Sequence, residues 1–271
     1  MTRGSVASGR ARLAVEVSGD ETAPPIAFLH AGVTDRRSWQ PLVDHLGGGV
    51  RAVRHDARGY GETAYEPETG WSPVADAIAV LDALAIDRTI VIGCSMGGRT
   101  ALDLTLEHPE RVSALVVIGS AIGGAPRPHL DEPTAVLDAQ IQAAERRGDL
   151  DEVNRLEAEL WLDGPGHAGR AADLPRELFA AMNGRALRAP DPGTTESRED
   201  AWSRLGEVTA PTLVLVGQLD LVHVRRNARH IAESIADARL IELKAVAHLP
   251  HLEGDRETLD AIAEFVASRT T

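Results

Sequence analysis

Short, almost wholly apolar segments recur along the chain and alternate with longer segments of helical periodicity. Residues 90–92 read Ile-Val-Ile and residues 213–216 read Leu-Val-Leu-Val, so neither segment offers a polar face to water. Strands that are apolar on both faces are typical of parallel sheets that helices cover on each side. The alternation predicts a doubly wound α/β fold, with strands at residues 11–17, 26–29, 52–55, 89–92, 114–118, 212–216 and 239–243.

Helical patterns fill most intervals between these predicted strands. A serine and a proline at positions 72 and 73 form a capped helix start, and we expect this helix to continue to residue 84. Further helices are predicted at residues 97–107, 224–235 and 257–267.

The strand–helix alternation stops between residues 121 and 205. The segment 123–128 reads Gly-Gly-Ala-Pro-Arg-Pro, a cluster that breaks regular structure. We therefore expect a core made of residues 1–120 and 206–271, with residues 121–205 inserted as a helical cap of the kind that holds specificity in α/β folds. The cap helices are predicted at residues 133–147, 150–162, 174–187 and 197–205.

Composition excludes several functional classes. The 271 residues include 41 acidic and 28 basic side chains, and the net charge of −13 is the wrong sign for binding nucleic acid or anionic membrane. The chain has no apolar run of the ~20 residues that a membrane helix needs, and its N-terminus lacks the apolar segment of a signal peptide. Cys94 is the only cysteine, which excludes an intramolecular disulfide, and zinc-type spacing is absent. We expect a cytoplasmic protein that acts on a small molecule without metal or cofactor, its oligomeric state being open.

The segment Gly93-Cys94-Ser95-Met96-Gly97 follows a predicted strand and begins a predicted helix. In that context G-x-S-x-G is typical of a nucleophile elbow, where a serine occupies a sharp, strained turn. Larger side chains two positions before and after the serine would collide with the strand and the helix, so glycine is needed at both. The alternative is a glycine-rich turn with an incidental serine. We predict that Ser95 is a nucleophile.

A serine hydroxyl needs a base to take its proton and an acid to orient that base. His248 follows the last predicted strand, at the same sheet edge as Ser95, whereas His251 is better interpreted as a surface loop residue. Asp220 ends the preceding strand, although turn chemistry also favours aspartate there. The order Ser95, Asp220, His248 is the one this architecture requires, so we predict that these three are catalytic.

The negative charge that develops on the attacked oxygen needs hydrogen-bond donors. One should be the backbone N–H of Met96, directly after the nucleophile. The second should come from the loop after the second predicted strand, with Gly32 the first candidate and Val33 the alternative. We expect His30, in the same loop, to be a structural hydrogen-bonding residue, and Asp56 and Arg58 to form an ion pair that fixes a loop of their own.

Together these segments resemble the α/β-hydrolase superfamily, over essentially the whole chain. The matching segments are the oxyanion loop at 30–32, the D-x-R-G-x-G turn at 56–61, the elbow at 93–97, the acid at 220 and the H-x-P-H segment at 248–251. The turn and the elbow look like those of the small esterase, enol-lactonase and perhydrolase group. The resemblance implies an eight-stranded, mostly parallel sheet with an N-terminal hairpin, and cofactor-free hydrolysis through an acyl-enzyme. Two positions depart from the family pattern, where Ala31 and Ala247 replace frequent glycines.

The leading hypothesis is a hydrolase of carboxylic esters or lactones with a Ser-His-Asp triad. Serine at position 95 argues against haloalkane dehalogenases and epoxide hydrolases, which resemble this fold and use aspartate there. Carbon–carbon bond hydrolysis of a vinylogous diketone, or peracid formation, would use the same triad and stays open. A ligand-binding protein without catalysis is a further alternative, but such a protein has no reason to keep nucleophile, base and acid.

The predicted cap carries apolar side chains that are candidates for substrate contact, although each could equally pack among the cap helices. These candidates are Trp161, Phe179, Met182 and Trp202. A broad aromatic pocket would also need aromatic residues from the loops of the core, namely Trp39, Tyr60, Tyr65 or Trp71.

Overall fold

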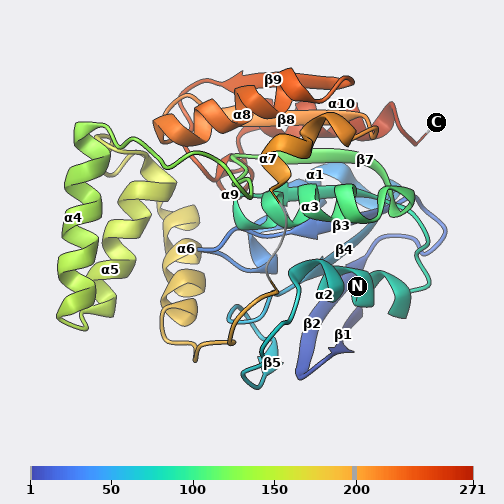
Figure 1. Cartoon of the computed structure of the whole chain (residues 1–271), viewed down its shortest axis with the longest axis horizontal. Coiled ribbons are helices and arrows are strands. Elements are labelled where there is room, and N and C mark those ends of the chain that lie inside the picture. Colours follow the sequence, from blue (N-terminus) through green and yellow to red (C-terminus); the bar gives the residue numbers. More distant parts are fainter. Residues whose placement is uncertain (1, 197–199, 271) are drawn as a thin grey trace.

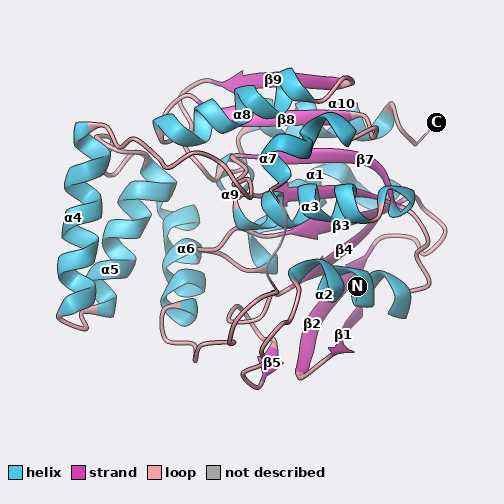
Figure 2. Ribbon diagram, in the orientation of Figure 1, coloured by secondary structure: helices cyan, strands magenta, loops and turns pink. Residues whose placement is uncertain are grey.

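The strands of the protein lie in one sheet at the centre of the molecule (Figures 1 and 2). The structure, a computed structural model, describes residues 2–196 and 200–270. Its strands are β1 (Thr2–Ser8), β2 (Ala11–Ser18), β3 (Pro25–Leu29), β4 (Arg51–His55), β5 (Ala64–Tyr65), β6 (Thr89–Cys94), β7 (Val112–Ile118), β8 (Thr212–Gly217) and β9 (Ala238–Leu243).

Within the described chain, eight strands follow one another in the order β1-β2-β4-β3-β6-β7-β8-β9, and the short β5 pairs with β2. Each neighbouring pair from β4 to β9 is parallel. The pairs β1–β2 and β2–β4 are antiparallel, and β1 and β2 form the N-terminal hairpin. The predicted doubly wound, mostly parallel sheet is therefore confirmed.

Helices cover both faces of this sheet because both faces of its inner strands are apolar. One face carries α1 (Gln40–Leu46), α9 (Pro250–Glu253) and α10 (Arg256–Ala267), which share one core cluster. The other carries α2 (Pro73–Ala83), α3 (Met96–Glu107) and α8 (Val222–Ser234). Short 3₁₀ turns occur at Arg36–Trp39, Gly47–Gly49, Pro109–Arg111 and Leu205–Glu207. None of the helices in the described ranges is long and apolar enough to span a lipid bilayer.

Between β7 and β8 the described chain forms helices and no strand. We term residues 121–205 the helical insertion. Its first three long helices stand side by side at one end of the sheet (Figure 1). Positions 197–199 of the last predicted insertion helix lie outside the described residues. The helices are α4 (Glu132–Arg146), α5 (Leu150–Glu157), a π-helix (Ala158–Asp163) that continues α5, α6 (Asp173–Ala186) and α7 (Ala201–Arg204).

Arg170 anchors the helical insertion to the core. Its two terminal nitrogens donate to the two carboxylate oxygens of Glu253, both at 2.7 Å. The same guanidinium donates to the carbonyl oxygen of Ala245 at 3.0 Å and to that of Asp163 at 2.8 Å. One side chain therefore connects the end of the π-helix, the loop after β9 and helix α9.

Candidate active site

Ser95 joins β6 to α3 in a strained backbone conformation. Its φ is +54° and its ψ is −113°, a region that residues with a side chain rarely adopt. A Cβ added at Gly93 would lie 2.3 Å from the carbonyl oxygen of Gly97, and one at Gly97 would lie 2.1 Å from that of Leu29. Strand and helix approach this closely only because both positions are glycine. The structure thus has the sharp turn that the motif predicts.

His248 and Asp220 meet as the sequence predicts. Nδ1 of His248 lies 2.8 Å from Oδ2 of Asp220, and both side chains are buried. A carboxylate accepts, so Nδ1 carries the proton and Nε2 is left as an acceptor. Nε2 is buried and has no hydrogen-bond partner in the part of the chain that the structure describes. The imidazole is therefore held in the form that can take up a proton.

The end of β7 brings Ser95 and the His248–Asp220 pair to one place. The backbone N–H of Ser95 donates to the carbonyl oxygen of Ile118 at 3.0 Å. The next residue, Gly119, has φ +52°, and a Cβ there would lie 2.9 Å from Nδ1 of His248 and 3.1 Å from Oδ2 of Asp220. Ser95 and its two predicted partners therefore flank two consecutive residues of one strand end.

Cys94 lies beneath this group. Its thiol is buried and approaches the carbonyl oxygen of His248 to 3.6 Å. Burial raises the pKa of the Cys94 thiol well above its ordinary value, and the nearby Asp220 carboxylate raises it further. The thiol therefore stays protonated at neutral pH and is not a competing nucleophile.

The loop after β3 lies against the first turn of α3. A Cβ at Gly32 would lie 3.4 Å from the Tyr60 hydroxyl and 3.6 Å from Sδ of Met96. Val33 is half-buried against the core in the same loop. Ala31 is not among the described residues with positive φ, which explains why alanine can stand where the family has glycine. Gly32 thus lies beside the Met96 side chain, and the two stay the predicted oxyanion donors.

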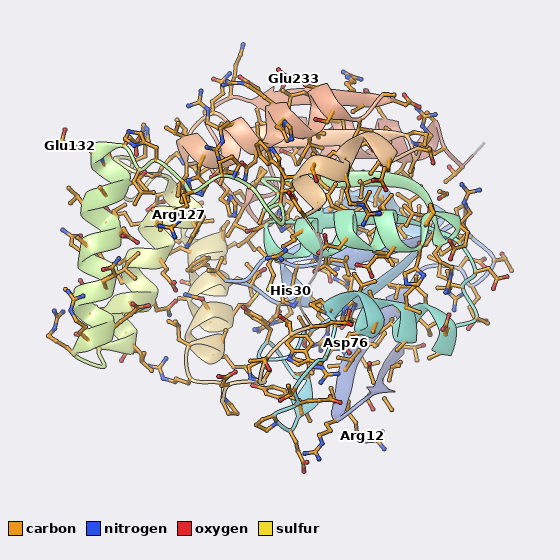
Figure 3. The ribbon with its side chains drawn as sticks, viewed as in Figure 1. Arg12, His30, Asp76, Arg127, Glu132 and Glu233 are labelled. Carbon is orange, nitrogen blue, oxygen red and sulfur yellow. The ribbon has the colours of Figure 1, made fainter. Side chains whose placement is uncertain are left out.

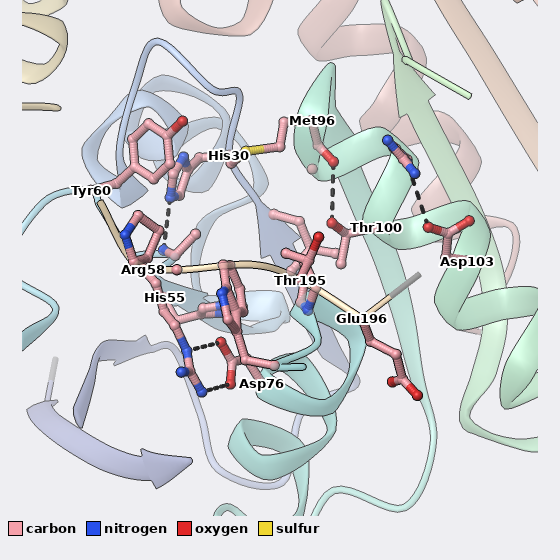
Figure 4. A pocket seen from close by; sticks show the side chains of 18 residues that line it. His30, His55, Arg58, Tyr60, Asp76, Met96, Thr100, Asp103, Thr195 and Glu196 are labelled. Carbon is pink, nitrogen blue, oxygen red and sulfur yellow. Dashed lines mark hydrogen bonds and ion pairs between the residues drawn. The ribbon is translucent and has the colours of Figure 1, made fainter. Parts of the chain in front are cut away.

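His30 fixes this loop through both ring nitrogens. The backbone N–H of Ala57 donates to Nε2 at 2.9 Å (Figure 4), so Nε2 is unprotonated and Nδ1–H donates to the carbonyl oxygen of Ala31 at 2.8 Å. The ring is buried and lies edge-on to Tyr60. The prediction of a structural hydrogen-bonding residue is confirmed.

The predicted ion pair between Asp56 and Arg58 is wrong. The Asp56 carboxylate accepts from the backbone N–H of Arg36 at 2.9 Å and pairs with the Arg36 guanidinium. Arg58 instead donates to both oxygens of Asp76, at 2.8 and 2.9 Å (Figure 4). The chain turns at residues 58–59, and the two side chains consequently reach different neighbours.

His251 is not the surface residue that the sequence suggests. It is fully buried, and its ring stacks on Trp39 with centroids 4.1 Å apart. Burial lowers the pKa of His251 to about 3, and the neighbouring His248 contributes in the same direction. Helix α9 begins one residue earlier, at Pro250, and its first turn directs this side chain into the core.

Of the four predicted substrate contacts, the structure brings Trp161 to the site. Its ring lies 4.7 Å from the His248 ring, and its carbonyl oxygen accepts from the His248 backbone N–H at 3.2 Å. Phe179 and Met182 are fully buried in a core cluster, and Trp202 stacks on His230 with ring centroids 3.6 Å apart. None of the four, Trp161 included, lines one of the cavities described below, because packing within the protein occupies their side chains.

Two cavities adjoin the loop after β3, the predicted oxyanion loop. The first, of about 380 Å³, lies between α2 and α3; His30 and Asp76, near the middle of the molecule in Figure 3, line it, and Met96 is at its rim (Figure 4). The second, of about 340 Å³, is bordered by Gly32 and by residues of the helical insertion. We term the second the insertion cavity. Its lining includes Tyr60, Glu157, Asn183 and Leu187.

Sequence reasoning missed Glu157 and Asn183 as site residues. One sequence pattern could have pointed to Glu157. It stands four residues before Trp161 in one predicted helix, and this spacing places both residues on one side of that helix. Asn183, on α6, has no comparable signal because only the packing of α6 against α5 brings it to Glu157.

The sequence pattern of the family described as alpha/beta hydrolase fold matches residues 24–255. The chain belongs to this family. This α/β-hydrolase is 28% identical over 265 residues to 3-oxoadipate enol-lactonase 1 of Acinetobacter baylyi, covering 94% of this chain and 93% of that one. It is also 28% identical to 2-hydroxymuconate semialdehyde hydrolase of a Pseudomonas species over 90% and 87% of the two chains. A solved hydrolase from Pseudomonas aeruginosa PA01 superposes with a TM-score of 0.79 at 26% identity, covering 97% and 98%.

Proposed function

We propose that this α/β-hydrolase cleaves a carboxylic ester or lactone through an acyl-enzyme on Ser95. The observation that carries the proposal is the 2.8 Å contact between His248 and Asp220, buried beside the strained turn of Ser95. The enol-lactonase relative supports the reaction class. Every group in the scheme is supplied by the chain itself, so the proposed reaction requires no cofactor.

In the first half-reaction, Oγ of Ser95 attacks the carbonyl carbon while Nε2 of His248 takes the hydroxyl proton. The carbonyl π-electrons move to the oxygen, which the backbone N–H groups of Met96 and Gly32 stabilise, with Val33 the alternative to Gly32. Asp220 stabilises the imidazolium. The oxygen lone pair then re-forms the carbonyl, the C–O bond breaks, and His248 returns its proton to the leaving alkoxide.

In the second half-reaction, His248 removes a proton from water as the water oxygen attacks the acyl-enzyme. The intermediate collapses, the bond to Oγ breaks, and Ser95 regains its proton from the imidazolium. The product is a carboxylic acid, and in a lactone the released hydroxyl stays on the same molecule.

We further propose that the helical insertion acts as a cap over this chemistry. Trp161 packs on His248 from the insertion, so the insertion covers one side of the base. Exclusion of water by such a cover strengthens the electrostatic interactions within a site.

The test is hydrolysis of p-nitrophenyl acetate followed in a stopped-flow instrument. Wild type should release a burst of p-nitrophenolate equal to the concentration of sites, and Ser95→Ala should give none. Asp220→Asn should stay folded and lose about 10⁴-fold in kcat, because the wrong imidazole tautomer then faces the serine. Asp138→Asn, which removes the same charge from a half-buried position on α4, should match wild type.

Turnover that survives in Ser95→Ala would contradict the mechanism, and full activity of Asp220→Asn would contradict the assignment of the acid. If folded wild type cleaves no ester but cleaves a vinylogous diketone, the ester proposal fails in favour of carbon–carbon hydrolysis. The semialdehyde hydrolase relative makes that second substrate the one to assay.

A further inference from the structure

Glu157 places a carboxylate in the insertion cavity. The cavity is bordered by Gly32 and Tyr60 on the core side and by Glu157 and Asn183 on the insertion side. Gly32 in turn adjoins Met96, the residue after the nucleophile. The carboxylate therefore borders a space of about 340 Å³ that reaches the oxyanion loop.

The helix that carries Glu157 faces the catalytic base. Glu157 is the last residue of α5, and Trp161, four residues later, lies in the π-helix that follows. The Trp161 ring packs on His248 at 4.7 Å. Residues four apart share one side of a helix, and π-helical turns are frequent at functional sites. Glu157 is thus within one turn of a residue that touches the base.

The Glu157 carboxylate has no cationic partner. Within the described chain it accepts one hydrogen bond, from the side-chain amide of Asn183 at 2.6 Å, and no ion pair reaches it. Burial raises the pKa of Glu157 above its ordinary value, and Glu145 adds to this. The charged groups that share the cavity are Arg58 and Asp191, and Arg58 is already paired with Asp76 and Glu68. The lining therefore carries two carboxylates against one guanidinium that is already paired. Arg185 and Arg188 line the adjoining cavity, where Arg188 pairs with Asp151.

We propose that Glu157 binds a positively charged group of the substrate, an alkylammonium or similar cation. The inference rests on the proposed ester hydrolysis and names its substrate class. A carboxylate in a partly dry site lacks part of its hydration, and a substrate cation would restore a favourable partner. The same charge disfavours substrates whose remote group is a carboxylate.

A purely structural role does not account for the charge. The hydrogen bond from Asn183 joins α5 to α6, and Asn183 also donates to Asn154 at 3.1 Å. A neutral glutamine at position 157 would accept the same hydrogen bond without the desolvation of a charge. Glu157→Gln consequently separates the two roles, because it keeps the connection and removes the charge.

The experiment compares esters that differ only in a remote charge. One set consists of p-nitrophenyl esters of 4-(trimethylammonio)butanoate, of its uncharged isostere 5,5-dimethylhexanoate, and of glutarate. A second set carries the charge on the leaving group, as acetyl thioesters of 2-(trimethylammonio)ethanethiol, 3,3-dimethylbutanethiol and 3-mercaptopropanoate. Wild type should show about tenfold higher kcat/KM for the cation than for its isostere in at least one set, the size that ~1.4 kcal/mol of charge–charge attraction across a partly buried contact would give.

Glu157→Gln should reduce this ratio to near one while leaving kcat/KM for the isostere within about twofold of wild type. Glu159→Gln is the matched control. Glu159 lies two residues away, pairs with Arg155 and lines no described cavity, so its variant should keep the wild-type ratio.

Three outcomes overturn the inference. If wild type hydrolyses the isosteres and shows no preference for the cation in either set, the inference about Glu157 is wrong and the proposed function is unaffected. A preference that persists in Glu157→Gln, or that Glu159→Gln loses equally, assigns the effect to the overall charge of the protein. Failure of wild type to cleave any of the six esters removes the proposed function together with the inference.

Discussion

A methyl group at position 119 would press on the His248–Asp220 pair without removing any atom of the proposed catalytic groups. The added Cβ would lie 2.9 Å from Nδ1 of His248 and 3.1 Å from Oδ2 of Asp220. Both separations are several tenths of an ångström shorter than an ordinary carbon contact of ~3.5 Å. The ring, the carboxylate or the strand end must therefore move in Gly119→Ala.

Two effects of different origin are expected. Gly119 has φ +52°, and an alanine held there should lower the free energy of unfolding by about 1 kcal/mol, which corresponds to roughly 2–4 °C in Tm. Displacing the imidazole by several tenths of an ångström should reduce kcat about 10- to 100-fold, since a misplacement of ~1 Å costs about 100-fold.

The assay is ester turnover together with thermal unfolding, and the control is Gly148→Ala. Gly148 has φ +69° and open space around the added Cβ, so its variant should show only the part of the Tm loss that comes from the backbone, with unchanged kcat. Combining Gly119→Ala with Asp220→Asn should give less than the product of the two separate losses, because both act on one hydrogen bond. Equal kcat values for the two glycine variants, or strictly multiplicative losses, would refute this account.

Two further predictions concern stability. Arg170→Met should lower the free energy of unfolding by about 2–4 kcal/mol at pH 7. Burial already raises the pKa of Glu253, so the loss should shrink as the pH falls and should be smallest below ~4, where that carboxyl becomes mostly neutral in the unfolded state as well. A loss independent of pH in urea titrations would contradict this. Burial lowers the pKa of His251 to about 3. As the pH falls below ~6.5, the unfolded state therefore binds a proton at His251 before the folded state does. This residue alone should then lower the free energy of unfolding by about 1.4 kcal/mol per pH unit. His251→Phe should therefore show a flatter pH dependence of unfolding, and an unchanged slope would exclude His251 as its source.

The buried strands were predictable because burial of both faces leaves a continuous apolar pattern. Residues 89–92 and 212–216 were expected as strands, and the structure has Thr89–Cys94 and Thr212–Gly217. Strand β1 carries no such pattern, since its side chains are mostly exposed and the backbone register with β2 holds it. The four-residue helix α9 is too short for a helical period to appear.

The candidate site likewise has a part that the sequence predicts and a part that it does not. The meeting of Ser95, Asp220 and His248 was predictable because each follows a strand, and parallel strands end at one sheet edge. The partners of Asp56 and Arg58 were not, because they depend on side-chain direction after a turn and on elements distant in sequence, namely Arg36 and Asp76. The catalytic roles of Ser95, Asp220 and His248 stay predictions, which the kinetic variants proposed above test.

The position of Cys94 gives the protein an internal reporter of solvent entry. It is the only thiol in the chain, and its side chain lies wholly inside, directly before Ser95. A thiol reagent can modify it only when β6 or its cover transiently opens, so the labelling rate measures how often this part of the core opens to the reagent. A substrate or inhibitor that holds the helical insertion against the core should slow the labelling of Cys94. The rate of these openings can thus be measured without attaching a spectroscopic tag to the protein.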